Sequence, residues 1–152
     1  MRVNWIFPTS VFSPKEFQTK KAYEEKILEC LLDKEVDLIV LAGYMRIIGS
    51  TLLDQYESRI INIHPSLLPD FPGLHGIRDA FEAGVKKTGV TIHYIDKGVD
   101  TGPIICQESV EIKKGDTLEE LERRIHQVEH RIYPKVIEQV VKEMKTMEAH
   151  IK

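Results

Sequence analysis

Apolar residues spaced three or four positions apart predict four helices along the chain. Two of these helices have a clear start, because Ser13 and Thr117 are each followed three residues later by a glutamate, as in a capping box. Pro134 falls inside the last helical pattern, and we expect it to kink that helix or to divide it. The predicted helices cover residues 13–33, 45–58, 77–83 and 117–144.

Extended segments alternate with these helices. Residues 36–43 form a nearly continuous apolar run, which is typical of a strand buried on both faces of a parallel sheet. Three further strands are predicted at 59–63, 89–95 and 103–112, and the middle one shows the alternation of a half-buried strand. Residues 1–10 hold one more short apolar segment that the pattern assigns poorly.

The alternation predicts an α/β fold, with an open, twisted and mostly parallel sheet flanked by helices. A length of 152 residues is typical of one domain, and no repeat or linker suggests a second, so the domain is expected to span residues 1–152. Sheets of this class usually open with a strand and a glycine-rich turn, yet no glycine precedes Gly43. We therefore expect the first βαβ unit to be absent, leaving a fold truncated at its amino end.

Composition removes several function classes. The chain carries 21 basic and 24 acidic residues, a net charge of −3, with no basic block of the kind that binds nucleic acid. No apolar run approaches the roughly 20 residues of a membrane span, and the amino end lacks a signal sequence, so a cytoplasmic location is expected. Isolated cysteines and histidines without ligand spacing predict no disulfide and no metal site.

Candidate chemistry gathers where one strand ends. Alternation places Asn62 and His64 on the same face, and Pro65 ends the strand at the carboxyl edge where open α/β sheets bind ligands. Imidazole exchanges protons near neutral pH, and an amide can donate to a developing oxyanion. Asp100 lies in a glycine-flanked turn, where it is either a turn residue or a carboxylate that orients His64.

Other polar residues support weaker hypotheses. Arg46 follows the apolar run and is either an anion contact or an ordinary surface arginine. His126 and Glu129 share a helix face, which either holds a polar ligand or is simply solvated. Ser66 suits the turn better than a nucleophilic role, so acyl-enzyme chemistry is not indicated.

Several motifs together resemble the folate-dependent formyltransferases. They are Leu-Ala-Gly-Tyr-Met-Arg-Ile at 41–47, Asn-Ile-His-Pro-Ser-Leu-Leu-Pro at 62–69, Phe-Pro-Gly at 71–73, and His93 followed by Gly-Val-Asp-Thr-Gly-Pro at 98–103. The resemblance covers about residues 11–141. The loop after the histidine favours the branch of the family that serves purine biosynthesis.

The resemblance implies a reaction and a role for each site residue. The donor would be 10-formyltetrahydrofolate as co-substrate, without a metal, and the acceptor would be the amino group of phosphoribosylglycinamide. His64 would donate the proton, Asn62 would hold the formyl oxygen, and Asp100 would favour the protonated form of His64. The implied folate-binding residues are Lys20, Met45, Arg46, Ile47, Ile48, Asn62, Asp96, Lys97, Gly98, Val99 and Asp100. The implied acceptor-binding residues are His126, Gln127, Val128 and Glu129.

The amino end departs from the family pattern. Family members begin with a glycine-rich turn that cradles the acceptor's phosphate, and this chain contains no such turn. We therefore expect impaired transfer, retained folate affinity, and either pairing of two copies along an apolar sheet edge at residues 36–42 or marginal stability. The alternatives are a related folate-dependent formyltransferase, a formyltetrahydrofolate hydrolase, or a folate-binding module without catalysis.

Overall fold

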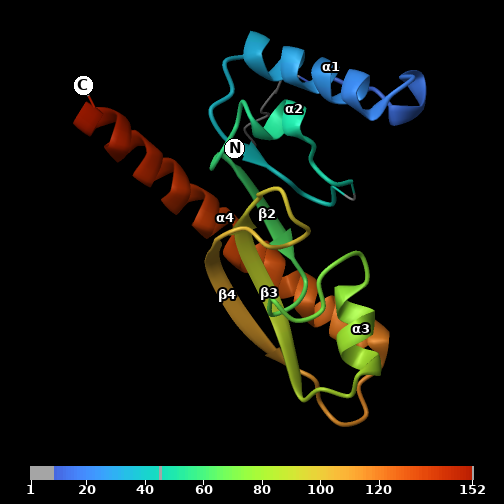
Figure 1. Cartoon of the computed structure of the whole chain (residues 1–152). Helices are drawn as coiled ribbons and strands as arrows, with labels where there is room; N and C mark the ends of the chain where they lie inside the picture. The colour runs from blue at the N-terminus through green and yellow to red at the C-terminus, as the bar shows by residue number, and fades with distance from the viewer. Residues whose placement is uncertain (1–8, 45, 152) are drawn as a thin grey trace, which may run out of the picture. The chain divides into compact units, whose positions relative to one another are not determined.

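The computed structural model describes residues 9–44 and 46–151 (Figure 1). By their internal contacts the residues form two compact units, 1–36 and 37–152, and each is described by itself. In the part of the chain that the structure describes, no helix is both long and apolar enough to cross a membrane.

The first unit contains a 3-10 helix, Pro14–Glu16, and helix α1, Lys20–Asp33. We expected one helix from residue 13, but the backbone is extended at Phe17 and a second start follows. The Ser13 hydroxyl accepts the Lys15 N–H, and Thr19 caps α1 by accepting the Ala22 N–H at 3.0 Å. The single-helix prediction is therefore wrong at 17–19, because Thr19 provides an N-cap of its own.

The second unit is built on an open, mixed sheet with strand order β1-β2-β3-β4. Strands β1 (Ile39–Val40) and β2 (Ile60–His64) are parallel, whereas β3 (Lys87–Tyr94) and β4 (Ile104–Glu111) continue the sheet with antiparallel pairs. The open sheet flanked by helices is confirmed, but the described strands form one parallel pair and two antiparallel pairs. The loop between β3 and β4 is too short for the helical crossover that a parallel pair requires.

Strand β1 is shorter and more exposed than its sequence predicts. Only two residues of the predicted strand 36–43 pair in the sheet, at one end of the strand order. The Val40 side chain is 37% exposed, so the prediction of a strand buried on both faces is wrong. A continuous apolar run does not distinguish an edge strand from a central one.

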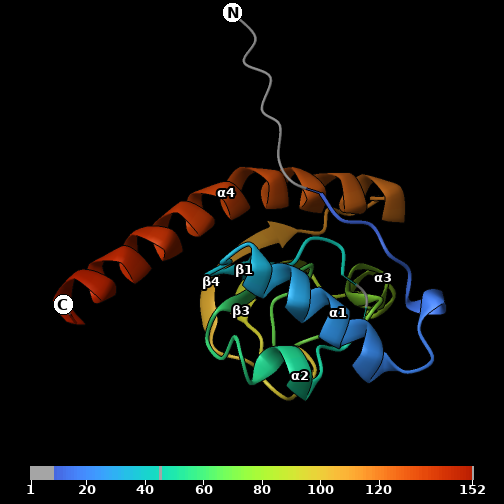
Figure 2. The same cartoon turned by 90° about the horizontal axis from the view of Figure 1, so that it is seen from above.

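Within its described residues, the second unit also contains three helices: α2 (Ser50–Leu53), α3 (Gly76–Glu82) and α4 (Leu118–Ile151). The predicted helix at 45–58 shrinks to the single turn of α2. Pro134 lies inside α4 without dividing it, and Figure 2 shows the helix bending along its length. The Thr117 hydroxyl accepts the Glu120 N–H at 3.2 Å, which confirms the predicted cap.

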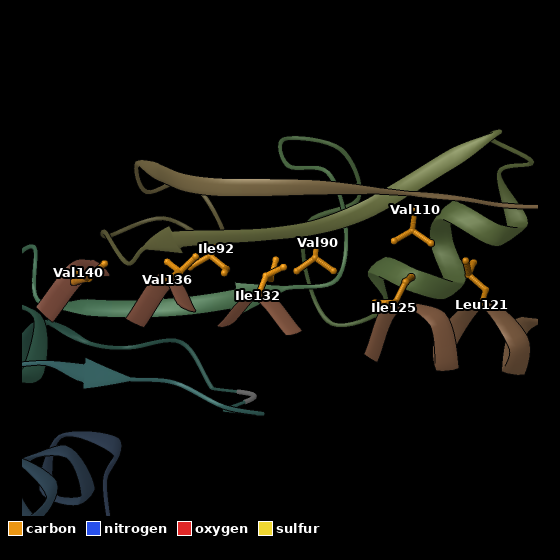
Figure 3. Close-up of a cluster of buried hydrophobic side chains, with 8 residues drawn as sticks. All are labelled: Val90, Ile92, Val110, Leu121, Ile125, Ile132, Val136 and Val140. Carbon is orange, nitrogen blue, oxygen red and sulfur yellow. The ribbon is translucent and has the colours of Figure 1, made fainter. Parts of the chain in front are cut away.

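The core of the second unit lies between the sheet and α4 (Figure 3). Val90 and Ile92 of β3 point toward α4, so that Thr91 and His93 face the opposite side of the sheet. This apolar cluster fixes the plane from which the polar face projects. Its buried members are Val90, Ile92, Val110, Leu121, Ile125, Ile132, Val136 and Val140.

Candidate functional site

The polar face of the sheet is formed by paired residues of β2 and β3. In the antiparallel register Asn62 lies opposite His93, and His64 lies opposite Thr91. His64, Thr91 and His93 are buried, and Asn62 is half-buried. Residues directly opposite each other in such a pair carry neighbouring side chains, so all four gather at the carboxyl end of β2.

A buried hydrogen-bond network holds the loop that follows His64. The Thr91 hydroxyl donates to the Ser66 carbonyl at 2.7 Å and accepts the Leu68 N–H at 3.1 Å. The Gln107 amide of β4 donates to the Leu68 carbonyl at 2.9 Å and to the Thr91 hydroxyl at 3.0 Å. Because the polar groups of this network bond one another, the loop is fixed against β3 and β4.

Asp100 reaches His64 from a different loop. Its Oδ2 lies 3.5 Å from His64 Nδ1 and accepts the Gly73 N–H at 2.8 Å. The backbone at Asp100 is left-handed, with φ +54°, a conformation that aspartate tolerates better than most residues. The predicted proximity of His64 and Asp100 is therefore confirmed, and the catalytic role of each residue stays a prediction.

The second ring nitrogen of His64 is also engaged. Its Nε2 lies 2.9 Å from the Phe71 carbonyl oxygen, and the whole residue is 4% exposed. Gly76 packs against the same nitrogen, since a Cβ at this position would approach Nε2 within 3.1 Å. A glycine at the start of α3 thus lets the loop close over the histidine.

The loop between β3 and β4 is shaped by Asp96. Its Oδ1 accepts the Thr101 hydroxyl at 2.6 Å and the Gly98 N–H at 2.8 Å. These two hydrogen bonds, that from Thr101 first, hold the pKa of the Asp96 carboxyl below its usual value. An ionised Asp96 therefore ties together the turn that carries Asp100.

The other predicted folate-binding residues differ in their exposure. Ile47 and Val99 expose apolar side chains, at 58% and 49%, whereas Ile48 is buried. Lys20 begins α1 in the first unit, where it forms an ion pair with Glu24 at 3.8 Å. Met45 lies outside the described residues. Among the remaining ones, Arg46, Lys97 and Gly98 are exposed and Asp96 is half-buried.

The predicted acceptor residues separate into different surroundings. Glu129 lines a cavity of about 490 Å³, together with Gly43 after β1 and Ile63 of β2. Gln127 and Val128 line another cavity, of about 570 Å³, beside β4. Successive helix residues point about 100° apart, so four consecutive residues do not share one pocket. The exposed His126 places its Nδ1 3.4 Å from Glu129 Oε2.

Two residues of the site, His93 and Tyr133, were not among the predicted site residues. His93 Nε2 lies 3.7 Å from Asp100 Oδ1, so this histidine joins the polar cluster. The Tyr133 hydroxyl of α4 donates to the carbonyls of Leu41, at 2.7 Å, and Ile61, at 3.3 Å, and burial raises the pKa of its phenol. His93 belongs to one of the motifs that carry the family resemblance, but no role was predicted for it, because the sequence does not specify its register with Asn62.

The sequence profile of the Formyl transferase family matches residues 5–137, a span that contains Asn62, His64, Asp100 and Glu129. This chain belongs to the formyl transferase family. The match includes the polar cluster and the cavity beside Glu129, so the geometry described above lies inside the family's shared region.

Two similar proteins show which members of the family this formyltransferase resembles in sequence. Over 134 residues it is 56% identical to the phosphoribosylglycinamide formyltransferase of Bacillus subtilis, covering 88% of this chain and 69% of the relative. It is 42% identical to the trifunctional purine biosynthetic protein adenosine-3 of Drosophila melanogaster, again over 88% of the chain but 10% of that protein.

Solved structures give the same result for the fold. The phosphoribosylglycinamide formyltransferase of Bacillus halodurans superposes with a TM-score of 0.86 at 55% identity, covering 88% of this formyltransferase and 69% of that chain. Glycinamide ribonucleotide transformylase 1 of Geobacillus kaustophilus superposes with a TM-score of 0.85 at 56% identity, covering 88% and 71%.

Proposed function

We propose that this formyltransferase transfers the formyl group of 10-formyltetrahydrofolate to the amino group of phosphoribosylglycinamide, a step of purine biosynthesis. The observation that carries the proposal is the contact of His64 Nδ1 with Asp100 Oδ2 at 3.5 Å, next to Asn62 on the same face. Direct formyl transfer needs an imidazole, a carboxylate and an amide, and these three groups lie together at the carboxyl end of β2.

Each of the three residues has a separate task in the proposed step. The acceptor's amine forms a bond to the formyl carbon while the bond from that carbon to the folate nitrogen breaks. The Asn62 amide donates to the formyl oxygen as negative charge develops on it. His64 supplies the proton that the leaving folate nitrogen gains, and the attacking amine loses one, so atoms and charge balance. The Asp100 carboxylate orients the imidazole of His64 through its approach to Nδ1.

The substrate has to replace one contact to reach His64. The Nε2–H of His64 donates to the Phe71 carbonyl, and Gly76 packs against the same nitrogen. A reacting group that accepts a proton from Nε2 takes the place of the Phe71 carbonyl. Binding and a small shift of the 70–76 loop are therefore coupled in the proposed mechanism.

Two further features of the second unit fit the two substrates. The exposed apolar side chains of Ile47 and Val99 suit the flat ring system of a folate. The cavity beside Glu129 suits the hydroxyl and amide groups of the acceptor, since a carboxylate accepts hydrogen bonds from both. Of the predicted acceptor residues, Glu129 is therefore the one we assign to this contact.

The proposal is tested by mixing the chain with 10-formyltetrahydrofolate and phosphoribosylglycinamide and measuring the formylated product. We expect product from the unsubstituted chain, and His64→Gln should lower kcat by about 100-fold or more while leaving the binding of a folate analogue unchanged. Absence of product at high enzyme concentration, with the chain folded, would contradict the proposal.

Two parallel reactions separate the alternatives. Consumption of 10-formyltetrahydrofolate without an acceptor would favour a hydrolase, and transfer to a different amine would favour a related formyltransferase. Folate binding that is unaffected by His64→Gln, with no consumption under any condition, would favour a non-catalytic folate-binding module.

We further propose a cytoplasmic location, one formyltransferase domain over residues 1–152, and pairing of two copies along β1. The end position of β1 in the described sheet and the exposed Val40 side chain support this pairing. Sedimentation over a range of concentrations should detect a dimer that Val40→Lys weakens, and a monomer at all concentrations would refute it.

A further inference from the structure

His93 is a buried histidine that has no role in the reaction proposed above. It lies on β3 opposite Asn62, and its side chain is fully buried. Among the described residues its Nε2 has no hydrogen-bond partner. A buried polar atom without a partner costs stability, so a reason specific to this site is needed.

The hydrogen-bonding pattern defines which nitrogen of His93 carries a proton. Nδ1 lies 2.9 Å from the Tyr94 carbonyl oxygen, which accepts hydrogen bonds but donates none. Nδ1 is therefore the protonated nitrogen, and Nε2 faces Asp100 Oδ1 at 3.7 Å. The unpartnered nitrogen thus points at the carboxylate of the catalytic cluster.

His64 shows the same arrangement from the other side. Its Nε2 donates to the Phe71 carbonyl, and its Nδ1 faces Asp100 Oδ2. In each ring, the nitrogen farther from Asp100 donates to a backbone carbonyl, and the nitrogen nearer to Asp100 faces its carboxyl group. If both rings were neutral and Asp100 were ionised, two lone pairs would face a negative charge. A ring nitrogen supports a carboxylate oxygen only as a donor, so the support that His93 gives to Asp100 Oδ1 requires a proton on Nε2 as well as on Nδ1.

We propose that His93 is a positioning residue for formyl transfer, which holds Oδ1 of Asp100 so that Oδ2 stays directed at His64 Nδ1. The inference rests on the function proposed above, in which Asp100 acts through His64. Gly73 holds Oδ2 through its N–H, and His93 completes the support on the other oxygen. The carboxyl group is then fixed at both oxygens, which keeps the distance to the catalytic ring constant.

A pair of amide substitutions separates this role from simple packing. The amide nitrogen of His93→Gln extends as far as Nε2 and can donate to Asp100. The amide nitrogen of His93→Asn extends only as far as Nδ1, so it keeps the bond to the Tyr94 carbonyl and leaves Asp100 Oδ1 without support. Thr88→Val is the matched control, because Thr88 is a buried residue of the same strand whose hydroxyl has no partner among the described residues.

The first measurement does not depend on activity. In nitrogen-15 NMR of the histidine rings, we expect His64 signals to be retained in His93→Gln and Thr88→Val and displaced in His93→Asn. Asp100→Asn leaves His93 in place and should displace the ring signals of both histidines. Unchanged His93 signals in Asp100→Asn, or identical His64 signals in the Gln and Asn variants, would overturn the proposal even if the chain shows no transfer.

The second measurement is steady-state kinetics of formyl transfer. His93→Asn should lower kcat by about 100-fold with both KM values within about twofold, and His93→Gln should restore kcat to within about threefold of the unsubstituted chain. Equal kcat values for the two variants would assign His93 to packing alone.

Discussion

The two faces of the β2–β3 ribbon differ in what holds them together. On one face Val90 and Ile92 contact α4 through apolar area, which is non-directional. On the other face the Thr91 hydroxyl is held by directional hydrogen bonds to Ser66, Leu68 and Gln107, and His64 and His93 both lie close to Asp100. Neighbouring residues of one strand therefore serve different purposes, with stability on one side and chemistry on the other.

The largest expected effect comes from removing the charge at the centre of the polar face. Asp100→Asn keeps the size of the side chain but loses the carboxylate beside His64, so kcat should fall by about 1,000-fold or more. Thermal unfolding should change little. Asp116→Asn, which removes a carboxylate paired with Arg124 away from the polar face, is the control and should leave kcat unchanged. A large loss of stability in Asp100→Asn would show that the polar face also stabilises the fold, which contradicts the difference drawn between the two faces.

The apolar face should show the opposite behaviour. Ile92→Ala removes a fully buried side chain that packs in the core, and we expect the free energy of unfolding to fall by about 3 kcal/mol. Urea unfolding measures this loss. Transfer per folded molecule at low temperature should stay near that of the unsubstituted chain, and a proportionate loss of kcat would show that the two faces are coupled.

A smaller effect is expected where the polar face also supports a loop. Thr91→Val removes a hydroxyl that bonds Ser66, Leu68 and Gln107, which should cost about 2 kcal/mol of unfolding free energy. It should also lower kcat, because the loop after His64 loses its anchor. Thr88→Val, a buried hydroxyl without a partner among the described residues, should cost less than Thr91→Val. An equal loss of unfolding free energy in the two variants would show that the hydrogen bonds of Thr91 do not stabilise the loop.

The smallest effect concerns pH. The pKa of Asp96 is lowered in the folded protein, first by the Thr101 hydroxyl, so its contribution to stability is present above the unfolded pKa and is lost as pH falls through the folded one. Thr101→Val should raise the folded pKa toward its ordinary value and so reduce this acid-side loss. Unfolding midpoints measured from neutral to acidic pH should then converge for the two proteins at low pH.

Much of the second unit follows from local sequence signals. The predicted strands at 59–63, 89–95 and 103–112 agree with β2, β3 and β4 to within two residues at each end, and the cap at Thr117 is present. These elements were predictable because alternation, turn residues and capping are properties of neighbouring residues. The Asn62 and His64 pair followed from the same period of two.

The sequence-based predictions are wrong or incomplete where the structure depends on contacts between residues far apart in the sequence. The run 36–43 is apolar enough for a central strand, yet only Ile39–Val40 pairs, at the end of the described sheet. The approach of His93 to Asp100 depends on the register of β3 against β2 and on the loop that carries Asp100. Neither property is local, so the approach of His93 to Asp100 could not be predicted from the sequence.

The left-handed backbone at Asp100 has a consequence for any attempt to improve this protein. Glycine adopts this conformation without a steric penalty, so a search that rewards melting temperature alone would favour Asp100→Gly. The gain in robustness would remove the negative charge that the histidines converge on. Position 100 is therefore one where thermal optimisation and turnover select opposite residues.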